Sequence, residues 1–510
     1  MGHRTGMGGF MNAIADLPVD PKVKEYTARR WELLIDGDWV KAKSEQTFQT
    51  HNPATGELLA ECAQADEVDI DRAVRAARRA FETGPWPAMT ATERGRLIWK
   101  LGDLVLEHLE EFAELETLDN GKPISVTRAV DVPLTAELFQ YMAGWANKLE
   151  GNTIPLSVPY TPGAMYHAYT LREPLGVVGQ IIPWNFPLLM AAWKLGPALA
   201  GGNTVVFKPA EHTPLTALRL GELIMEAGFP KGVVNVVPGP GPIAGEALAA
   251  HPDVDKIAFT GSTAVGKRII GAATGNLKKV TLELGGKSPN VVFADADMDQ
   301  AIPGAASAIF FNHGQVCSAG SRLYVEDGAF DEVTEGVAEQ AKQMKVGPGM
   351  DPATEMGPLV AEEQLDRVWD YVESGFAEGA RALSGGRKMD GPGYFIEPTV
   401  LVDTNPNMKV VREEIFGPVV TAHPFSREND VLPAANDTIY GLGSGVWTKD
   451  LSRAHRMAER LHAGTVWVNC YNVFDAALPF GGYKQSGWGR EMGHEVLNLY
   501  TQIKSVCMRL

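Results

Sequence analysis

Two side chains of this chain combine a sulfur nucleophile with a carboxylate. Cys317 lies in GQVCSAGSR (314–322), where small neighbours leave room for a substrate, and Glu283 lies in LELGGKSPN (282–290). Chemistry that forms a thioester and then hydrolyses it needs a thiolate and a base that activates water. A free thiol has a pKa of about 8.5, so the site must lower the pKa of Cys317 or deprotonate it locally. A lone cysteine is also a common buried apolar residue, so Cys317 predicts covalent catalysis only together with its neighbours.

Three further polar side chains follow short apolar runs. Asn185, in PWNFP (183–187), is suited to donate a hydrogen bond to an oxyanion that forms on a substrate carbonyl. Lys208 and Glu211 lie in KPAE (208–211), where a carboxylate accepts the hydroxyls of a ribose and repels a 2′-phosphate. Taken singly, Asn185 also fits a turn, and Lys208 with Glu211 also fits a solvated ion pair.

A glycine turn, FTGSTAVG (259–266), follows another apolar run. Such a turn lets backbone N–H groups approach a pyrophosphate, although alone it also fits a purely structural role. It is not G-x-G-x-x-G, and Arg268 stands where a nucleotide triphosphatase needs Ser or Thr for Mg²⁺. The acidic run at 295–299 lacks the Gly and Glu of a calcium loop, and the histidines lack metal-binding spacing. We therefore expect no metal site.

The elements that must position these groups follow from the apolar pattern. From 175 to 285, short apolar runs alternate with helical stretches, which predicts βαβ units and a parallel sheet. Asn185, Lys208, Gly261 and Glu283 then fall at the carboxyl ends of strands, where such sheets bind ligands. Strands are expected at 176–182, 204–207, 233–237, 256–259 and 280–284, with helices at 186–200, 214–227, 242–250 and 263–273.

Other elements are expected on both sides of this region. A helix is predicted at 66–82, and one long helix from 91 to the stop signal NGKP (120–123), with Thr90 and Glu93 as a capping box. A second α/β series begins near 288, with a Gly/Pro-rich surface excursion at 384–398. Its strands are expected at 290–294, 321–326, 418–425, 443–447 and 464–469.

Composition restricts the class of partner. The chain has 510 residues, 45% of them hydrophobic and 21% charged, which is ordinary for a soluble globular protein. A net charge of −17 argues against a nucleic-acid partner, which needs a basic face. No run approaches the roughly 18 apolar residues of a membrane span, so no membrane partner is expected. The four cysteines, Cys62, Cys317, Cys470 and Cys507, form no disulfide framework and indicate a reducing cytoplasm.

From residue 30 onwards the chain resembles the aldehyde dehydrogenase superfamily, in its NAD-dependent hydrolytic branch. The resemblance depends on several motifs that occur in the order typical of that family. They are PWNFP (183–187), KPAE (208–211), FTGST (259–263), LELGGKSPN (282–290), GQVCSAGSR (314–322), EEIFGPV (413–419) and PFGGYKQSGWGRE (479–491).

The resemblance implies a role for each matching residue. Cys317 would attack the aldehyde, Asn185 and the Cys317 backbone N–H would hold the oxyanion, and Glu283 would activate the water that hydrolyses the thioester. The cofactor would be NAD; Glu211 favours it over NADP, while Lys208 leaves NADP open. The residues implied to bind the cofactor are Trp184, Lys208, Glu211, Gly261, Ser262, Glu414 and Phe416.

The resemblance also implies an α/β fold with two Rossmann-like parallel-sheet domains and a small β oligomerisation element. The expected NAD-binding domain comprises 26–150 and 175–285, and the catalytic domain 286–485. Residues 151–174 and 486–510 would form the oligomerisation element, and residues 1–25 are expected to be a disordered N-terminal lead. A homo-oligomer is expected, a tetramer rather than a dimer.

The substrate is expected to enter through an apolar tunnel. Its implied lining is Phe186, Leu189, Met190, Trp193, Val316, Ser318, Phe474 and Phe480, although Leu189, Met190 and Trp193 equally fit plain core. VFDAALPFGGYKQSG and KSVCMRL resemble phenylacetaldehyde dehydrogenases, which favours an aromatic or arylalkyl aldehyde. Asp475, expected near the mouth, leaves betaine aldehyde open, and an aliphatic aldehyde is the other alternative. A CoA-acylating enzyme is disfavoured by Glu283, and a catalytically silent structural or binding protein is the rival of another class.

Overall fold

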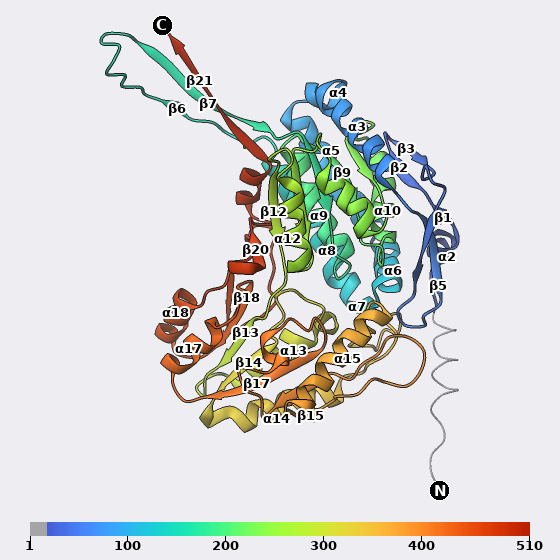
Figure 1. The fold of residues 1–510 in the computed structure, drawn as a ribbon, viewed down its shortest axis with the longest axis vertical. Helices are drawn as coiled ribbons and strands as arrows, with labels where there is room; N and C mark the ends of the chain where they lie inside the picture. Colours follow the sequence, from blue (N-terminus) through green and yellow to red (C-terminus); the bar gives the residue numbers. More distant parts are fainter. Residues whose placement is uncertain (1–17) are drawn as a thin grey trace.

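A computed structural model describes residues 18–510. It shows two stacked α/β units and a long arm of strands that projects from the first of them, with the C-terminus at the arm's tip (Figure 1). Among the described residues, none of the helices combines the length and the apolar character needed to cross a lipid bilayer.

The first unit contains an eight-stranded sheet with the order β20-β12-β11-β8-β9-β10-β2-β3. The strands from β12 to β10 are parallel, and the chain fills one side with β8, β9 and β10 before it adds β11 and β12 on the other. The strand order thus reverses between β8 and β11, which is where an open parallel sheet binds its ligand. The strands are β2 (Leu33–Ile35), β3 (Asp38–Val40), β8 (Val177–Ile181), β9 (Thr204–Lys208), β10 (Val234–Val236), β11 (Lys256–Thr260), β12 (Lys279–Glu283) and β20 (Gly487–Trp488).

Helices cover both faces of this sheet, so β8, β9 and β11 are buried along their whole length. Burial on both faces explains why these strands are continuous apolar runs without alternation. Helix α9 is itself buried throughout, because α5 and α8 pack against it. The helices are α3 (Glu67–Glu82), α4 (Pro85–Ala88), α5 (Ala91–Glu107), α6 (Leu109–Asn120), α7 (Ile124–Val126), η1 (Thr127–Asp131), α8 (Val132–Trp145), α9 (Pro187–Ala200), α10 (Leu215–Ala227), η2 (Gly241–Gly245), α11 (Glu246–Ala250) and α12 (Thr263–Ala273).

The second unit contains a seven-stranded sheet with the order β15-β16-β17-β14-β13-β18-β19, in which only β15 is antiparallel. The chain passes from the first sheet to the second between β12 and β13, so Glu283 lies where the two units meet. The strands are β13 (Pro289–Val292), β14 (Arg322–Glu326), β15 (Arg381–Ser384), β16 (Thr399–Val402), β17 (Val419–Phe425), β18 (Gly443–Trp447) and β19 (Thr465–Val468). The helices are α13 (Met298–Phe310), η3 (Phe311–Gly314), η4 (Asp327–Ala329), α14 (Phe330–Gln343), α15 (Glu362–Ala377), α16 (Lys409–Arg412), α17 (Glu428–Asn436), α18 (Leu451–Arg460) and η5 (Lys484–Ser486).

The projecting arm is a three-stranded antiparallel sheet of β6 (Thr153–Ile154), β7 (Tyr166–Pro174) and β21 (Thr501–Arg509). The C-terminal strand therefore pairs with a segment that precedes it by more than three hundred residues. The remaining elements are α2 (Pro21–Ala28), η6 (His494–Leu499), and a small sheet of β1 (Arg30–Trp31), β4 (Thr47–His51) and β5 (Leu58–Ala63).

The expected α/β class, with two largely parallel sheets and a small β element, is confirmed. Three boundaries differ. Helix α2 occupies the end of the lead expected over 1–25, of which residues 1–17 lie outside the described residues. The helix predicted from 91 to 120 is interrupted at His108, whose φ of −105° and ψ of 26° leave the helical region. Strand β20 joins the first sheet, so the β element expected over 486–510 is confined to β21.

The interruption at His108 has a local cause that periodicity does not reveal. The apolar stripe continues on both sides of it, so the pattern alone extends the helix. The His108 Nδ1 contacts the Glu111 carboxylate at 3.0 Å, and Glu111 pairs with Arg219 of α10. These side-chain contacts start α6 as a new helix packed against α10.

Candidate active site

The loop that carries Cys317 is held in an unusual backbone conformation. Helix α13 ends at Phe310, and Asn312, His313 and Gly314 then have φ values of 47°, 58° and 68°. Positive φ is costly for residues other than glycine and is a common feature of active-site loops. At Gly314 a side chain is excluded as well, because a Cβ would lie 2.1 Å from the Gly417 carbonyl oxygen. The loop therefore leaves α13 abruptly and presents Cys317 to the junction of the two units.

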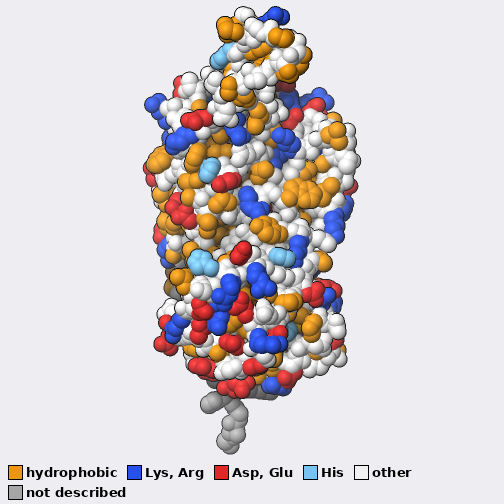
Figure 2. Space-filling model, turned by 90° about the vertical axis from the view of Figure 1, so that its left-hand side faces the viewer, with side chains coloured by type: hydrophobic (Ala, Val, Ile, Leu, Met, Phe, Trp, Pro, Cys, Tyr) orange, Lys and Arg blue, Asp and Glu red, His pale blue; other side chains and the backbone are white. Residues whose placement is uncertain are grey.

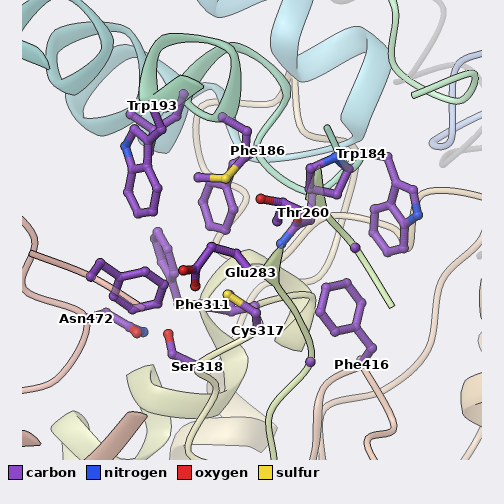
Figure 3. A pocket seen from close by; sticks show the side chains of 18 of the residues that line it. Trp184, Phe186, Trp193, Thr260, Glu283, Phe311, Cys317, Ser318, Phe416 and Asn472 are labelled. Atoms are coloured by element: carbon purple, nitrogen blue, oxygen red, sulfur yellow. The ribbon is translucent and has the colours of Figure 1, made fainter. Parts of the chain in front are cut away.

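The Cys317 sulfur faces the space in which the Glu283 carboxylate also ends (Figure 3). Burial raises the pKa of the Cys317 thiol to about 12, and the nearby Glu283 and Glu414 carboxylates add to the rise. A neutral thiol is a weak nucleophile. The resting site consequently holds a protonated sulfur and needs a base beside it.

Glu283, the last residue of β12, places a carboxyl group in this cavity. Neither of its carboxylate oxygens has a hydrogen-bond partner among residues 18–510. Burial, together with the Glu491 carboxylate, raises the pKa of Glu283 well above its usual range, against the opposing charges of Lys194 and Arg490. Lys194 Nζ and Glu491 Oε1 themselves form a buried ion pair at 2.5 Å. A carboxyl group with a raised pKa and free oxygens is suited to accept a proton from a thiol or from water.

Asn185 lies at the carboxyl end of β8, and its side chain points to the Cys317 loop. Its Nδ2 donates to the Gln315 carbonyl at 2.8 Å, while Asn312 Nδ2 donates to the Asn185 carbonyl at 2.9 Å. These two bonds join the first sheet to the loop before Cys317. A side-chain amide has two hydrogens, so one N–H of Asn185 remains for an oxyanion.

Cys317, Glu283 and Asn185 share one cavity of about 550 Å³. The expected tunnel residues line it, and its inner part is aromatic: the rings of Trp193, Phe474 and Phe480 lie 5.5–6.1 Å apart. Of the other predicted residues, Trp184, Gly261, Ser262, Glu414 and Phe416 also line it. The residues expected in the tunnel that line this cavity are Phe186, Leu189, Met190, Trp193, Val316, Ser318, Phe474 and Phe480.

The opposite part of the cavity lies at the point where the strand order reverses. There the rings of Trp184 and Phe416 meet edge to face at 5.2 Å, and Ser262 Oγ caps helix α12 by accepting from Val265 N at 3.3 Å. Glu414 Oε1 accepts from Gly286 N at 2.8 Å, and burial raises the pKa of Glu414 to about 7. A helix N-terminus, aromatic walls and a fixed carboxylate beside a parallel sheet fit a dinucleotide.

Lys208 and Glu211 lie together but outside the lining of this cavity. Lys208 Nζ is 3.3 Å from Glu211 Oε2, and Glu211 Oε1 accepts from Gly241 N at 3.2 Å. They follow β9, the strand next to β8, so they lie one strand away from the reversal point. An adenosine ribose at one end of an extended dinucleotide fits this place better than a nicotinamide does.

Comparison with known proteins decides the family. Residues 39–506 match the model of the aldehyde dehydrogenase family. A putative aldehyde dehydrogenase, DhaS, of Bacillus subtilis is 53% identical, with 97% of this chain and 99% of that protein covered. The human mitochondrial aldehyde dehydrogenase is 51% identical over 94% of this chain and 92% of its own. The chain belongs to the aldehyde dehydrogenase family.

The solved structure of a relative identifies the cofactor. The NAD⁺ complex of the aldehyde dehydrogenase from Bacillus cereus has a TM-score of 0.95 and 51% identity, covering 97% of this chain and 99% of that one. The protein is an NAD-dependent aldehyde dehydrogenase.

Asp475, expected near the mouth of the tunnel, is exposed and does not line the cavity of this aldehyde dehydrogenase. Its carboxylate accepts from Ala477 N at 2.8 Å. The polar residue of that loop that lines the cavity is Asn472. Its φ of 54° turns the chain, so the side chain three residues before Asp475 points inward. Asparagine tolerates a left-handed backbone better than most residues do, and this tolerance is the one sequence signal that could have pointed to Asn472.

Other lining residues of the enzyme were not expected from the sequence. Phe311 stacks with Phe186 at 6.2 Å between ring centroids, and Gln364 Nε2 donates to the Phe416 carbonyl at 2.7 Å. Phe311 and Gln364 belong to none of the family motifs, whereas Thr260, Leu284 and Gly285 lie within motifs but were not singled out. The missed residues are Ala129, Val130, Asp131, Leu134, Pro183, Thr260, Leu284, Gly285, Phe311, Gln364, Arg367, Asn472 and Val473.

Proposed function

We propose that this aldehyde dehydrogenase oxidises an aromatic or arylalkyl aldehyde, such as phenylacetaldehyde, to its carboxylic acid through a covalent bond to Cys317. The observation that carries the proposal is the single cavity in which Cys317, Glu283 and the free N–H of Asn185 meet an aromatic lining. A catalytically silent binder has no need for a strained loop that presents a thiol to an unpaired carboxylate.

The residues divide the chemistry between them. Glu283 takes the thiol proton of Cys317, and the sulfur attacks the aldehyde carbon to give a thiohemiacetal. The oxyanion accepts hydrogen bonds from Asn185 Nδ2 and from the Cys317 backbone N–H. NAD, when bound, supplies the acceptor for the hydride, which leaves a thioester on Cys317. After the thiol proton has passed from Glu283 to solvent, Glu283 removes a proton from the water that attacks the thioester. It returns this proton to the departing sulfur of Cys317, so the acid leaves and the thiol is restored.

Different residues are assigned to different parts of the cofactor. We assign Lys208 and Glu211 to the adenosine ribose, Gly261 and Ser262 with Trp184 to the diphosphate region, and Glu414 with Phe416 to the nicotinamide ribose. The residues assigned to the diphosphate and the nicotinamide ribose line the cavity at the sheet's reversal point, while Lys208 and Glu211 lie one strand away. Glu211 is a carboxylate, so NAD is expected to bind better than NADP.

The aromatic lining supports an aryl substrate. Rings of Trp193, Phe474 and Phe480 at centroid separations of 5.5–6.1 Å offer the edge-to-face contacts that a phenyl group prefers. Aromatic rings also attract a quaternary ammonium group, so betaine aldehyde belongs in any substrate panel. An aliphatic aldehyde is the third class to compare.

The test is NADH formation with NAD or NADP, without CoA, on phenylacetaldehyde, benzaldehyde, hexanal and betaine aldehyde. Oxidation of the aryl aldehydes at the highest kcat/KM supports the proposal. Activity with betaine aldehyde alone keeps the chemistry and overturns the substrate. A folded, NAD-binding protein that oxidises nothing in the panel argues for a silent binder.

The base is tested by Glu283→Gln, with the exposed Asp475→Asn as the matched amide control. We expect Glu283→Gln to reduce steady-state turnover by about 10²–10⁴-fold, because a positioned base contributes that much. Asp475→Asn should retain the wild-type rate. Steady-state turnover of Glu283→Gln at the wild-type level would remove Glu283 from the mechanism.

We also propose that the enzyme is a homo-oligomer, a tetramer rather than a dimer, assembled through the arm. Hydrophobic side chains gather on the arm's surface, where an isolated subunit would leave them in water (Figure 2). The exposed apolar residues of the arm are Ile154, Leu156, Tyr160, Met165, Leu171, Ile503, Met508 and Leu510. Light scattering on the purified protein gives the mass directly, and a monomer at micromolar concentration would refute the assembly.

The cytoplasm is the compartment we propose for the enzyme. All four cysteines are free thiols, and a long chain without disulfides is typical of a reducing compartment.

A further inference from the structure

Two polar side chains in the apolar tunnel lack the hydrogen bonds that burial ordinarily demands. Ser318, next to Cys317, has no exposed surface, and its hydroxyl has no partner among residues 18–510. The amide oxygen and the amide nitrogen of Asn472 are both inaccessible and also lack a partner within the described chain. Buried polar groups in folded proteins are nearly always bonded, so two such groups in one cavity need an explanation.

The two residues are held close to each other by the chain itself. Tyr471, which precedes Asn472, donates its hydroxyl to the Ser318 carbonyl at 2.8 Å. The amide of Asn472 and the hydroxyl of Ser318 consequently end in the same part of the cavity, on the Cys317 side (Figure 3). The apolar side chains of Trp193 and Phe480 line the same cavity.

A role in holding the loop does not explain Asn472. The matched case is Asn469, which has nearly the same left-handed backbone, with a φ of 53° against 54°. Asn469 donates from Nδ2 to the Thr448 carbonyl at 3.0 Å, and its Oδ1 accepts from Thr448 N at 3.0 Å. Its amide is fully used by the fold. Asn472 has the same turn geometry, yet its amide contacts no polar group of the fold, so the turn alone does not require it to be polar.

The charges around the cavity restrict what these groups bind. Glu283 lines the same cavity, and its buried carboxyl group provides no positive charge to balance a carboxylate or phosphate on the substrate. Arg367 is the only Lys or Arg among the lining residues, and it donates to the Glu414 carbonyl at 2.9 Å, at the far end of the cavity. A neutral group that both donates and accepts is therefore the best match. A hydroxyl group can donate to Asn472 Oδ1 while it accepts from Asn472 Nδ2 or from Ser318.

We infer that Ser318, the neighbour of Cys317, and Asn472 form a subsite for a hydroxyl group near the aldehyde carbon, so that hydroxylated aldehydes are preferred over their apolar counterparts. This inference rests on the proposed oxidation at Cys317 and narrows its substrate class. A site built to hydrogen-bond a hydroxyl discriminates strongly against the analogue without it, because the polar groups then stay buried and unpaired.

The test compares glycolaldehyde with propanal, which have the same number of heavy atoms and differ by a hydroxyl in place of a methyl group. The readout is the ratio of their kcat/KM values, measured on one enzyme preparation, so it does not depend on the folded fraction. Asn472→Leu and Ser318→Ala remove the two partners. Asp475→Asn, in the same loop but outside the cavity, is the control.

The expected result is that Asn472→Leu lowers the glycolaldehyde-to-propanal ratio by about tenfold and Ser318→Ala by about threefold to tenfold, while Asp475→Asn leaves it unchanged. Comparing each variant with wild type cancels the hydration of the aldehydes in water. If both substrates are oxidised and the ratio stays within twofold in both variants, the subsite is overturned and the oxidation stands. If the folded, NAD-binding wild type oxidises neither these aldehydes nor the aryl panel, the proposed function fails and the subsite with it.

Discussion

A single methyl group at Gly286 should displace Cys317. A Cβ on Gly286 would lie 2.2 Å from the Cys317 carbonyl oxygen, whereas real Cβ atoms essentially never lie within 3.0 Å of such an atom. The carbonyl must therefore move by about 0.8 Å or more. Gly286 has no positive φ, so alanine fits its backbone and the effect is steric. A misplacement of about 1 Å at a reacting group costs about 10²-fold in rate, which is about 2.7 kcal/mol of transition-state stabilisation.

The assay is kcat/KM of Gly286→Ala from NADH formation, with thermal unfolding measured on the same preparation. Overpacking costs about 1–3 kcal/mol of folding free energy, so the melting temperature should fall by several degrees while the protein stays folded. Gly271→Ala is the matched control, because it lies within α12 and nothing is within 4 Å of its Cβ position. A folded Gly286→Ala enzyme with kcat/KM within threefold of wild type would refute the steric reasoning.

Three further outcomes follow from the site. Burial raises the pKa of Cys317 to about 12, so the rate of its alkylation by iodoacetamide without NAD should rise about tenfold per pH unit from about pH 7 to about pH 10. The Cys317→Ala variant is the blank. A rate that reaches a plateau near neutral pH would contradict a buried thiol. Glu211→Gln should raise the NADP-to-NAD ratio of kcat/KM by about tenfold, because it removes a charge that repels a 2′-phosphate, and an unchanged ratio would dissociate Glu211 from the ribose. Tyr471→Phe removes the 2.8 Å hydrogen bond to the Ser318 carbonyl, which should lower the free energy of unfolding by about 1 kcal/mol and kcat/KM about fivefold. If kcat/KM stays at the wild-type value, this bond does not position the loop.

The first sheet shows how far apolar patterning reaches. Five buried runs between 176 and 284 gave strands β8 to β12 within a residue or two, because strands buried on both faces have no alternative to continuous apolar sequence. The short edge strands β3 and β15 carried no such signal, and the buried strand β2 is only three residues long. Strand β20 was missed because two residues are fixed in place only by pairing with Leu282 and Glu283.

Some site residues could be predicted from the sequence and others could not. Cys317, Glu283 and Asn185 were identified from the sequence, because each stands in a motif whose residue types fit one chemistry. The sequence did not show that Asn472, rather than Asp475, points into the cavity. This direction depends on a left-handed turn and on the hydrogen bond between Tyr471 and Ser318. Lys208 and Glu211 were expected with the other cofactor residues, but the structure places them one strand away from the cavity.

The sequence by itself determined the fold class and the alternation of parallel strands with helices, and it predicted the residues that we propose react. Local apolar periodicity and short motifs encode these properties, so neighbours along the chain suffice to read them. Only the tertiary structure decided the raised pKa of Cys317, the unpaired carboxylate of Glu283 and the polar pair Ser318–Asn472. Burial and hydrogen-bond satisfaction depend on which distant segments meet, and that is a property of the packed chain rather than of any segment.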